Sequence, residues 1–228
     1  MTIKKIALYL TSLSALFAME TARAQVYIAP EAGATFGQVN TKLLKDFYYT
    51  DVSTKPQLSY QGGIGFQVFL NRNLAIQTGV FYKRLSYNDT YYNDSYPNLA
   101  YPSTISYHIH YGQIALSLSY FHQLGNTGSA FAGLGGYAMN AFAAKTGAGV
   151  DLSLGNGSDN FLKPVDAGAL AYLGYQFRFG GFLRLQYAHG LVNLSTEKEY
   201  YSNYGNSLSL TMGFRLRMKT RQVESKHW

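Results

Sequence analysis

The sequence predicts an all-β fold: an eight-stranded antiparallel up-and-down β-barrel that crosses a membrane. Between Val26 and Met218, eight stretches of about 10 to 17 residues alternate apolar and polar side chains. The connections between these stretches are alternately very short and very long. Closed membrane barrels have this layout, with tight turns on one side and loops on the other.

The composition favours spanning strands over spanning helices. Hydrophobic residues make up 47% of the chain, but after the N-terminus no stretch reaches the roughly 18 to 20 apolar residues that a spanning helix needs. A spanning sheet must close, because each backbone N–H and C=O group in the hydrocarbon needs a partner. The 21 Tyr, 14 Phe and 23 Gly suit aromatic girdles and turns, and 14% charged residues is low for a soluble enzyme.

The N-terminus has the layout of a secretory signal. Lys4 and Lys5 precede an apolar stretch at 6–18 that is too short to span, and a small-x-small site at 22–24 precedes Gln25. A non-cleaved anchor is the alternative. The expected organisation is a signal peptide at 1–24, the barrel at 25–218 and a basic periplasmic tail at 219–228.

The eight strands are expected at 25–36, 57–70, 73–88, 103–121, 129–145, 166–179, 181–195 and 206–218. The second, fourth and sixth connections are short and contain Gly or Asn, which suit hairpin turns that need positive φ. These connections are 71–72, 122–128 and 180–181. The others are long, polar and rich in Tyr, Asn and Asp. With the N-terminus in the periplasm, they face outside the cell.

The strand at 57–70 shows the alternation clearly. Its expected lumen face is Ser59, Gln61, Gly63, Gly65 and Gln67, and its expected lipid face is Leu58, Tyr60, Ile64, Phe66, Val68 and Leu70. The strands at 166–179 and 206–218 repeat the pattern. A water-soluble lipocalin-like barrel would invert it. Aromatic residues at the ends of the apolar faces, together with the alternating connection lengths, favour the membrane barrel.

Two strands are less regular. In 103–121 the apolar parity changes at Gly112 and Gln113, and we expect a β-bulge there that keeps the apolar face outward. The strand at 129–145 has many Ala and Gly residues and no clear outward face, so its register stays open.

The last strand and the overall charge indicate partners. Thr211, Gly213, Leu216 and Met218 are spaced like the C-terminal signal that the barrel insertion machinery reads in outer-membrane proteins. The expected location is the outer membrane of a Gram-negative bacterium after signal-peptide cleavage, with outer-membrane lipid and this machinery as partners. A protein partner at the loops or the periplasmic side is also expected. The +7 charge is scattered, so no nucleic-acid partner is expected.

Several phrases of the chain resemble the outer-membrane β-barrel domain family of PorT-like proteins from Gram-negative bacteria. They are GGIGF at 62–66 with LAIQTGVFY at 74–82; AGLGGY at 132–137; and residues 168–177 with LQY at 185–187, Gly190, Leu191 and Asn193. The resemblance implies an eight-stranded outer-membrane barrel and, for most members, no biochemical activity. PorT itself is linked to a secretion system.

The lumen of an eight-stranded barrel is just wide enough for side chains to fill, so a conducting pore is not expected. We expect a polar network there, with Glu31 as the one carboxylate among four arginines. The excess of arginines toward the periplasmic end leaves a bound anion as an alternative. The inward candidates are Glu31, Gln61, Gln67, Gln77, Lys83, Gln176, Arg178, Arg184, Gln186, Arg215 and Arg217.

The chain is not expected to be an enzyme, and no cofactor is expected. The alternative is a lipid A acyl-modifying barrel, of the deacylase or palmitoyltransferase type, in which an activated hydroxyl attacks an acyl carbonyl. His108, His110 and Ser106 are the weak catalytic candidates, but no carboxylate lies at a diagnostic spacing.

The long connections are the preferred functional surface. Tyrosine supplies rigid amphipathic contact area, as in recognition surfaces, although these tyrosines could instead only extend the hairpins. No metal site is expected; Asp151, Asn156, Asp159 and Asn160 fit no known calcium loop. The expected function is a non-enzymatic, membrane-anchored scaffold or binding protein. Its loop candidates are Tyr91, Tyr92, Tyr96, Tyr200, Tyr201 and Tyr204.

Overall fold

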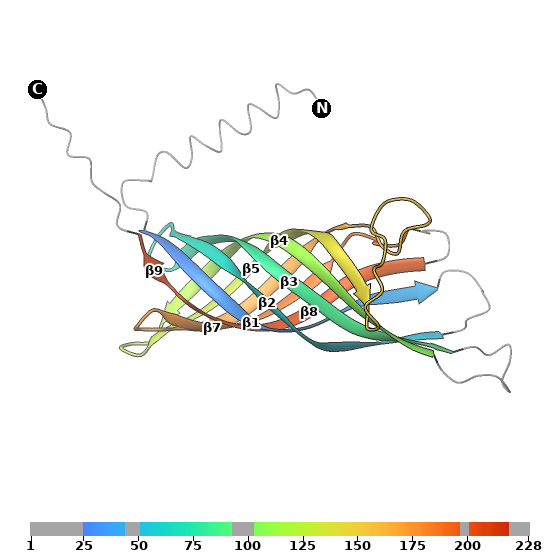
Figure 1. The fold of residues 1–228 in the computed structure, drawn as a ribbon. Helices are drawn as coiled ribbons and strands as arrows, with labels where there is room; N and C mark the ends of the chain where they lie inside the picture. Colours follow the sequence, from blue (N-terminus) through green and yellow to red (C-terminus); the bar gives the residue numbers. More distant parts are fainter. Residues whose placement is uncertain (1–24, 44–50, 93–102, 197–200, 219–228) are drawn as a thin grey trace, which may run out of the picture.

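The computed structural model describes residues 25–43, 51–92, 103–196 and 201–218, which form a closed antiparallel β-barrel (Figure 1). β9 continues β8 beyond Arg215 and pairs with β1, so the wall has eight strands, as predicted. The strands are β1 (Gln25–Leu43), β2 (Asp51–Phe69), β3 (Leu74–Tyr92), β4 (Ser103–Gln123), β5 (Gly128–Thr146), β6 (Val165–Phe177), β7 (Gly181–Gly190), β8 (Tyr201–Phe214) and β9 (Leu216–Arg217).

The first and last strands close the barrel. Glu31 on β1 is opposite Gly63 on β2 and opposite Gly213 on β8. Each long strand therefore has two hydrogen-bonded neighbours over most of its length. At the loop end, β1 beyond Gly37 pairs with β8 alone and β2 before Gln57 pairs with β3 alone. Among the described residues, no helix is long and apolar enough to cross a bilayer.

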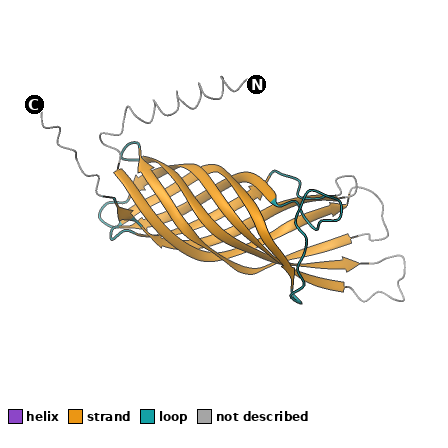
Figure 2. Cartoon of the chain, turned by 45° about the horizontal axis from the view of Figure 1, so that its top comes forward, coloured by secondary structure: helices purple, strands orange, loops and turns teal. Residues whose placement is uncertain are grey.

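The connections are short at one end of the barrel and long at the other (Figures 1 and 2). The tight turns at 70–73, 124–127 and 178–180 define what we call the turn end, and the long connections define the loop end. Gly125 and Gly180 have φ of 60° and 100°, which glycine adopts without the strain that a Cβ would add. The turn chemistry predicted from Gly and Asn is confirmed at these positions.

Around the middle of the barrel the outside is apolar and the inside is polar. On β8, Leu210 and Met212 are 56% and 65% exposed, while the intervening Ser209 and Thr211 are 1% exposed. β2 repeats this with exposed Leu58 and buried Ser59. This confirms the predicted faces, and it is the arrangement of a barrel surrounded by lipid.

Toward the loop end this polarity inverts. On β4, Tyr107, Ile109 and Tyr111 are buried inside the barrel, and the intervening His108 and His110 face outward. The apolar residues therefore do change face at Gly112 and Gln113, and the predicted bulge that would keep them all outward is wrong: Gln113, Ser117 and Ser119 continue the inward row of Ile109 and Tyr111. We call the ring of exposed apolar side chains around the middle of the barrel the apolar band. Beyond this band a strand is surrounded by water, so apolar side chains are stable only inside.

The bulge predicted on the fourth strand lies on its neighbour. His110 pairs with Ala143 and Tyr111 with Ala141, so Phe142 of β5 is the extra residue. The register of β5, which the sequence left open, is now defined: Phe131, Tyr137 and Met139 point inward. Its outward face was difficult to recognise because much of it consists of Ala and Gly.

Several strands extend further at the loop end than predicted. β1 ends at Leu43, β2 begins at Asp51 and β3 ends at Tyr92. The segment after Asn88 was expected to be a loop, but Asp89 is a buried strand residue. The apolar-outward pattern that marks a spanning strand is missing from these extensions, because they lie past the apolar band.

Candidate functional site

Aromatic side chains close the lumen at the turn end. Phe121 lies between Phe69 and Phe131, with ring centroids 5.1 Å from each, and Phe131 contacts Phe182 edge-on at 6.5 Å. The guanidinium of Arg215 lies 4.4 Å from the ring centroid of Tyr27. These rings form a floor between the lumen interior and the turn end.

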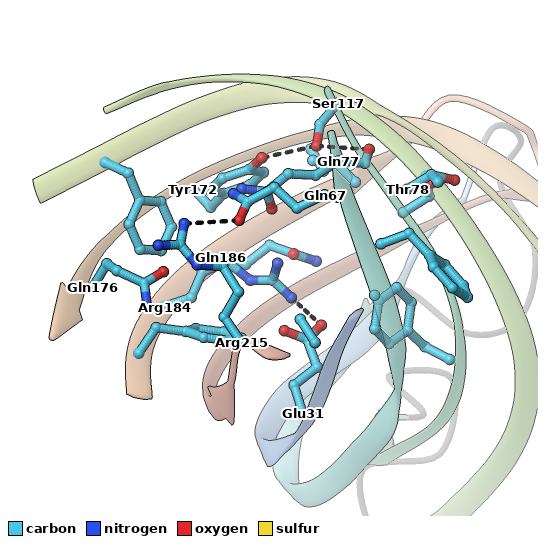
Figure 3. A pocket seen from close by; sticks show the side chains of 18 of the residues that line it. Glu31, Gln67, Gln77, Thr78, Ser117, Tyr172, Gln176, Arg184, Gln186 and Arg215 are labelled. Carbon is cyan, nitrogen blue, oxygen red and sulfur yellow. Dashed lines mark hydrogen bonds and ion pairs between the residues drawn. The ribbon is translucent and has the colours of Figure 1, made fainter. Parts of the chain in front are cut away.

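Above this floor lies a polar layer around a cavity of about 50 Å³ (Figure 3). Arg184 donates a hydrogen bond to Glu31 and forms a buried ion pair with it. Arg215 Nη1 donates to Gln67 Oε1 at 3.1 Å. At roughly 10–15 Å³ per water, the cavity has room for only a few waters. Among the described residues, this layer therefore leaves space for waters and not for a larger solute.

Most of the predicted lumen residues lie where the sequence placed them. Gln77 and Arg215 are half-buried and line the cavity. The predicted inward positions of Arg178 and Arg217 are wrong. Arg178 is exposed in the turn after β6, beyond the last inward position of that strand. Arg217 has inward parity on β9 but is exposed at the rim. The buried members are Glu31, Gln61, Gln67, Lys83, Gln176, Arg184 and Gln186.

The sequence reasoning missed a second buried carboxylate, Asp166. It is 0% exposed and accepts a hydrogen bond from Tyr137 OH at 3.1 Å, while its Oδ1 has no hydrogen-bond partner among the described residues. Lys83 lies within electrostatic reach of Asp166 and donates to Ser207 Oγ at 2.6 Å. The alternation in the sequence could have identified it, because Asp166 and the inward Gln176 lie on the same face of one strand.

Apolar residues close the lumen at the loop end. The ring of Phe161, from the connection between β5 and β6, stacks on Tyr107 with centroids 4.9 Å apart. Leu162 of the same connection and Leu194 after β7 are 2% and 0% exposed. Lys163 Nζ donates to the carbonyl oxygen of Asn193 at 3.3 Å, which links the two connections. They form a cap over the polar layer.

The weak catalytic candidates lie on the outer face of the barrel. His108 Nδ1 is 3.0 Å from Ser86 Oγ, and His110 Nδ1 is 2.6 Å from Tyr82 OH. Ser106 uses its carbonyl oxygen to accept a hydrogen bond from Gly147 N, and no described hydrogen bond joins its hydroxyl to either imidazole. No described carboxylate is hydrogen-bonded to either histidine. The predicted grouping with Ser106 is therefore not formed, and Ser86 takes its place.

The tyrosine candidates fall mainly on strands. Tyr91 and Tyr92 belong to β3, while Tyr201 and the half-buried Tyr204 belong to β8. This corrects their assignment to loops: the hairpins continue beyond the positions where alternation was visible. The predictions for Tyr96 and Tyr200 lie outside the described residues, as do those for 1–24 and 219–228.

The two acidic side chains in the connection between β5 and β6 have partners within the protein. Asp151 pairs with Lys145 Nζ at 3.1 Å, and Asp159 accepts a hydrogen bond from Ser158 at 3.2 Å. Within the described ranges, no group of three or more His, Asp or Glu side chains is placed to hold a metal ion.

No protein-family model matches the chain, and no curated protein matches it in sequence. Solved structures match its fold. OprG of Pseudomonas aeruginosa, an outer-membrane protein, is 10% identical, with a TM-score of 0.51 over 86% of this chain and 98% of OprG. Neisserial surface protein A is 14% identical, with a TM-score of 0.45 over 85% and 99% of the two chains. Ail of Yersinia pestis is 12% identical, with a TM-score of 0.42 over 84% and 99%. The fold is that of eight-stranded outer-membrane barrels.

Proposed function

We propose that this chain is a non-enzymatic outer-membrane protein that presents its loop end outside the cell as a binding surface or scaffold. The turn end then faces the periplasm, since short turns are periplasmic in outer-membrane barrels. Residues 1–24 would be removed as a signal peptide, and the protein would be of the PorT-like type.

The observation that carries this proposal is the filling of the lumen. An aromatic floor, a polar layer with a cavity of only about 50 Å³ and an apolar cap follow one another along the barrel axis. A filled lumen does not favour transport, which leaves the outer surfaces as the places where a partner can bind. The strand extensions support the same proposal, because they hold a water-facing surface clear of the apolar band.

The cap supplies such a surface with defined shape. Phe161 and Leu162 anchor the connection at 147–164 to the barrel, and Asn160 Nδ2 donates to the carbonyl oxygen of Gly157 at 3.3 Å. A connection anchored in this way loses less conformational entropy when it binds a partner than a free one does. We expect the exposed tip around Ser158 to contact that partner.

Site-specific photocrosslinking in intact cells tests the proposal. A photoreactive residue at exposed Ser158 is expected to give a discrete protein adduct, and the same residue at the lipid-facing Leu116 is expected to give none. Exposed Arg178 tests the periplasmic side in the same way. Adducts at neither Ser158 nor Arg178 would contradict the binding role.

One observation favours the second candidate function, a lipid A acyl-modifying enzyme. The contact of 3.0 Å between His108 Nδ1 and Ser86 Oγ brings a hydroxyl to a general base on the outer face. However, Ser86 is only 3% exposed, and a triad needs a third group that orients the imidazole. Lipid A mass spectra from cells with the native chain and with Ser86→Ala separate the two functions: an acyl change present only with the native chain would establish the enzyme.

A further inference from the structure

The outer face of the barrel carries a cluster of basic side chains near the loop end of β3, β4 and β5. Arg84 on β3 is directly opposite His110 on β4, and His108 is directly opposite Lys145 on β5. We call these four residues the basic patch. At the same end of the barrel, β1 and β8 present the neutral amides of Gln38, Asn40 and Asn206 instead.

The patch lies where the apolar band ends. Two outward positions toward the turn end, Val80 and Ile114 are paired with each other and are each 60% exposed, as lipid-facing residues are. Tyr82 follows Val80 on the outer face of β3, and Arg84 comes next. In a bilayer, phosphates lie just beyond the hydrocarbon, so a lipid whose acyl chains contact Val80 and Ile114 places its headgroup at the basic patch.

Aromatic side chains hold the basic groups in place. The guanidinium of Arg84 lies 5.8 Å from the ring centroid of Tyr60, and its Nε has no hydrogen-bond partner among the described residues. Tyr82 hydrogen-bonds His110, and its ring lies 6.2 Å from that of Phe142. Aromatic rings are favoured at the interface between hydrocarbon and headgroups.

One charge of the basic patch, that of Arg84, is not compensated by the described part of the protein. Asp151 is 3.1 Å from Lys145 Nζ, but Glu31, Asp89 and Asp166 are buried inside the barrel. No described carboxylate forms an ion pair with Arg84. An external anion would therefore supply Arg84 with the counter-charge that the described residues do not provide.

From these observations we propose that the basic patch binds the phosphate of an anionic lipid in the outer leaflet. Arg84 supplies a guanidinium fork to the phosphate. The imidazole of His110, whose Nδ1 accepts a hydrogen bond from Tyr82 OH, supplies its Nε2–H as a second donor. The acyl chains of the lipid lie against Val80 and Ile114. The site is specific for a phosphorylated lipid rather than free phosphate, because the apolar contact and the charge contact are adjacent on one face.

Native mass spectrometry of the full chain in neutral detergent micelles tests this proposal, with bisphosphorylated lipid A as the probe. The double variant Arg84→Gln, His110→Gln is expected to bind lipid A about tenfold or more weakly, since a hydrogen bond to a charged group is lost. Arg178→Gln removes one positive charge at the turn end and is expected to bind as the native chain does. Arg84→Gln alone is a second patch variant in case the double variant does not fold.

The proposal also predicts the behaviour of related probes. Lipid A without phosphates is expected to bind about tenfold or more weakly than the bisphosphorylated form, and millimolar inorganic phosphate alone is expected not to compete. Equal binding by the native chain and the patch variants would overturn the proposal. An equal loss with Arg178→Gln would overturn it too, because binding would then follow net charge. Competition by inorganic phosphate would overturn the lipid as the ligand.

Discussion

Glu31 and Arg184 show how charged side chains are tolerated inside this barrel. Both are buried, they form an ion pair with each other, and the guanidinium of Arg184 also lies 5.3 Å from the ring centroid of Tyr172. Removal of two charges from water is costly, and the cost is offset only when each finds a close partner. The pair therefore helps to define a single packing of the lumen.

Breaking this pair is expected to destabilise the protein strongly. In Glu31→Ala, the guanidinium of Arg184 stays buried without its carboxylate, which costs about 3–5 kcal/mol in free energy of unfolding. Urea unfolding in micelles, followed by the heat-modifiable migration of the folded barrel on gels, measures this. The double variant Glu31→Leu, Arg184→Met is expected to lose less, because no unpaired charge remains. A larger loss in the double variant would contradict the account.

Gly133 on β5 provides a second test at the scale of a residue. It is opposite Tyr172 on β6, and a Cβ at Gly133 would lie 2.3 Å from Cζ of the tyrosine ring. Tyr172 OH is hydrogen-bonded to Ser117 and Ser119 at 2.8 and 2.6 Å, so the ring is not free to move aside.

Gly133→Ala is therefore expected to lower the free energy of unfolding by about 1–3 kcal/mol through overpacking. Gly112→Ala is the matched control, since a Cβ at Gly112 meets no atom within 4 Å. Urea midpoints of the two variants in the same micelles provide the comparison. Equal midpoints would show that the ring of Tyr172 adapts at no cost.

The exposed side chains of the strand β4 change from apolar to polar where the apolar band ends. Its outward residues Ile114, Leu116 and Leu118 are 60%, 60% and 51% exposed, and they are followed toward the loop end by His110 and His108. The inward residues change in the opposite sense, from Ser117 to Tyr111 and Ile109. One strand thus faces lipid in one part and water in the other.

A lysine introduced on the outer face of β4 is expected to lower the free energy of unfolding by different amounts in the two parts of the strand. Leu116→Lys places an ammonium in the apolar band and is expected to cost about 2–4 kcal/mol, whereas Thr104→Lys, on the same outer face near the loop end, is expected to cost about 0–1 kcal/mol. Unfolding in lipid vesicles by urea measures both. Equal costs would mean that the band is placed wrongly along the strand.

The sequence predicted the elements best where lipid faces one side and polar side chains fill the other. The alternation of Leu208, Leu210 and Met212 was sufficient to orient β8. The same reasoning placed Tyr107 and Tyr111 of β4 on the wrong face of the barrel. Alternation alone does not show where a strand leaves the membrane, and beyond that point the apolar side chains face inward. Asp166 was missed although its parity pointed inward, since the sequence alone did not show Lys83 within electrostatic reach.

At the scale of the whole molecule, floor, polar layer and cap make the barrel a filled cylinder. The Phe121 ring closes one end and the Phe161 ring the other, with a cavity of about 50 Å³ between them. We expect no steady ion conductance when the chain is reconstituted into planar bilayers. Single channels of constant size in the native chain would contradict a filled lumen.

The orientation of the barrel, with its loop end outside the cell, can be measured directly. Because the chain contains no Cys, single cysteines can report on it directly. In intact cells, a membrane-impermeant maleimide is expected to label Ser158→Cys, to label Arg178→Cys only after the outer membrane is permeabilised, and not to label the lipid-facing Leu116→Cys in either state. Full labelling of Leu116→Cys, or labelling of Arg178→Cys but not Ser158→Cys in intact cells, would contradict the account.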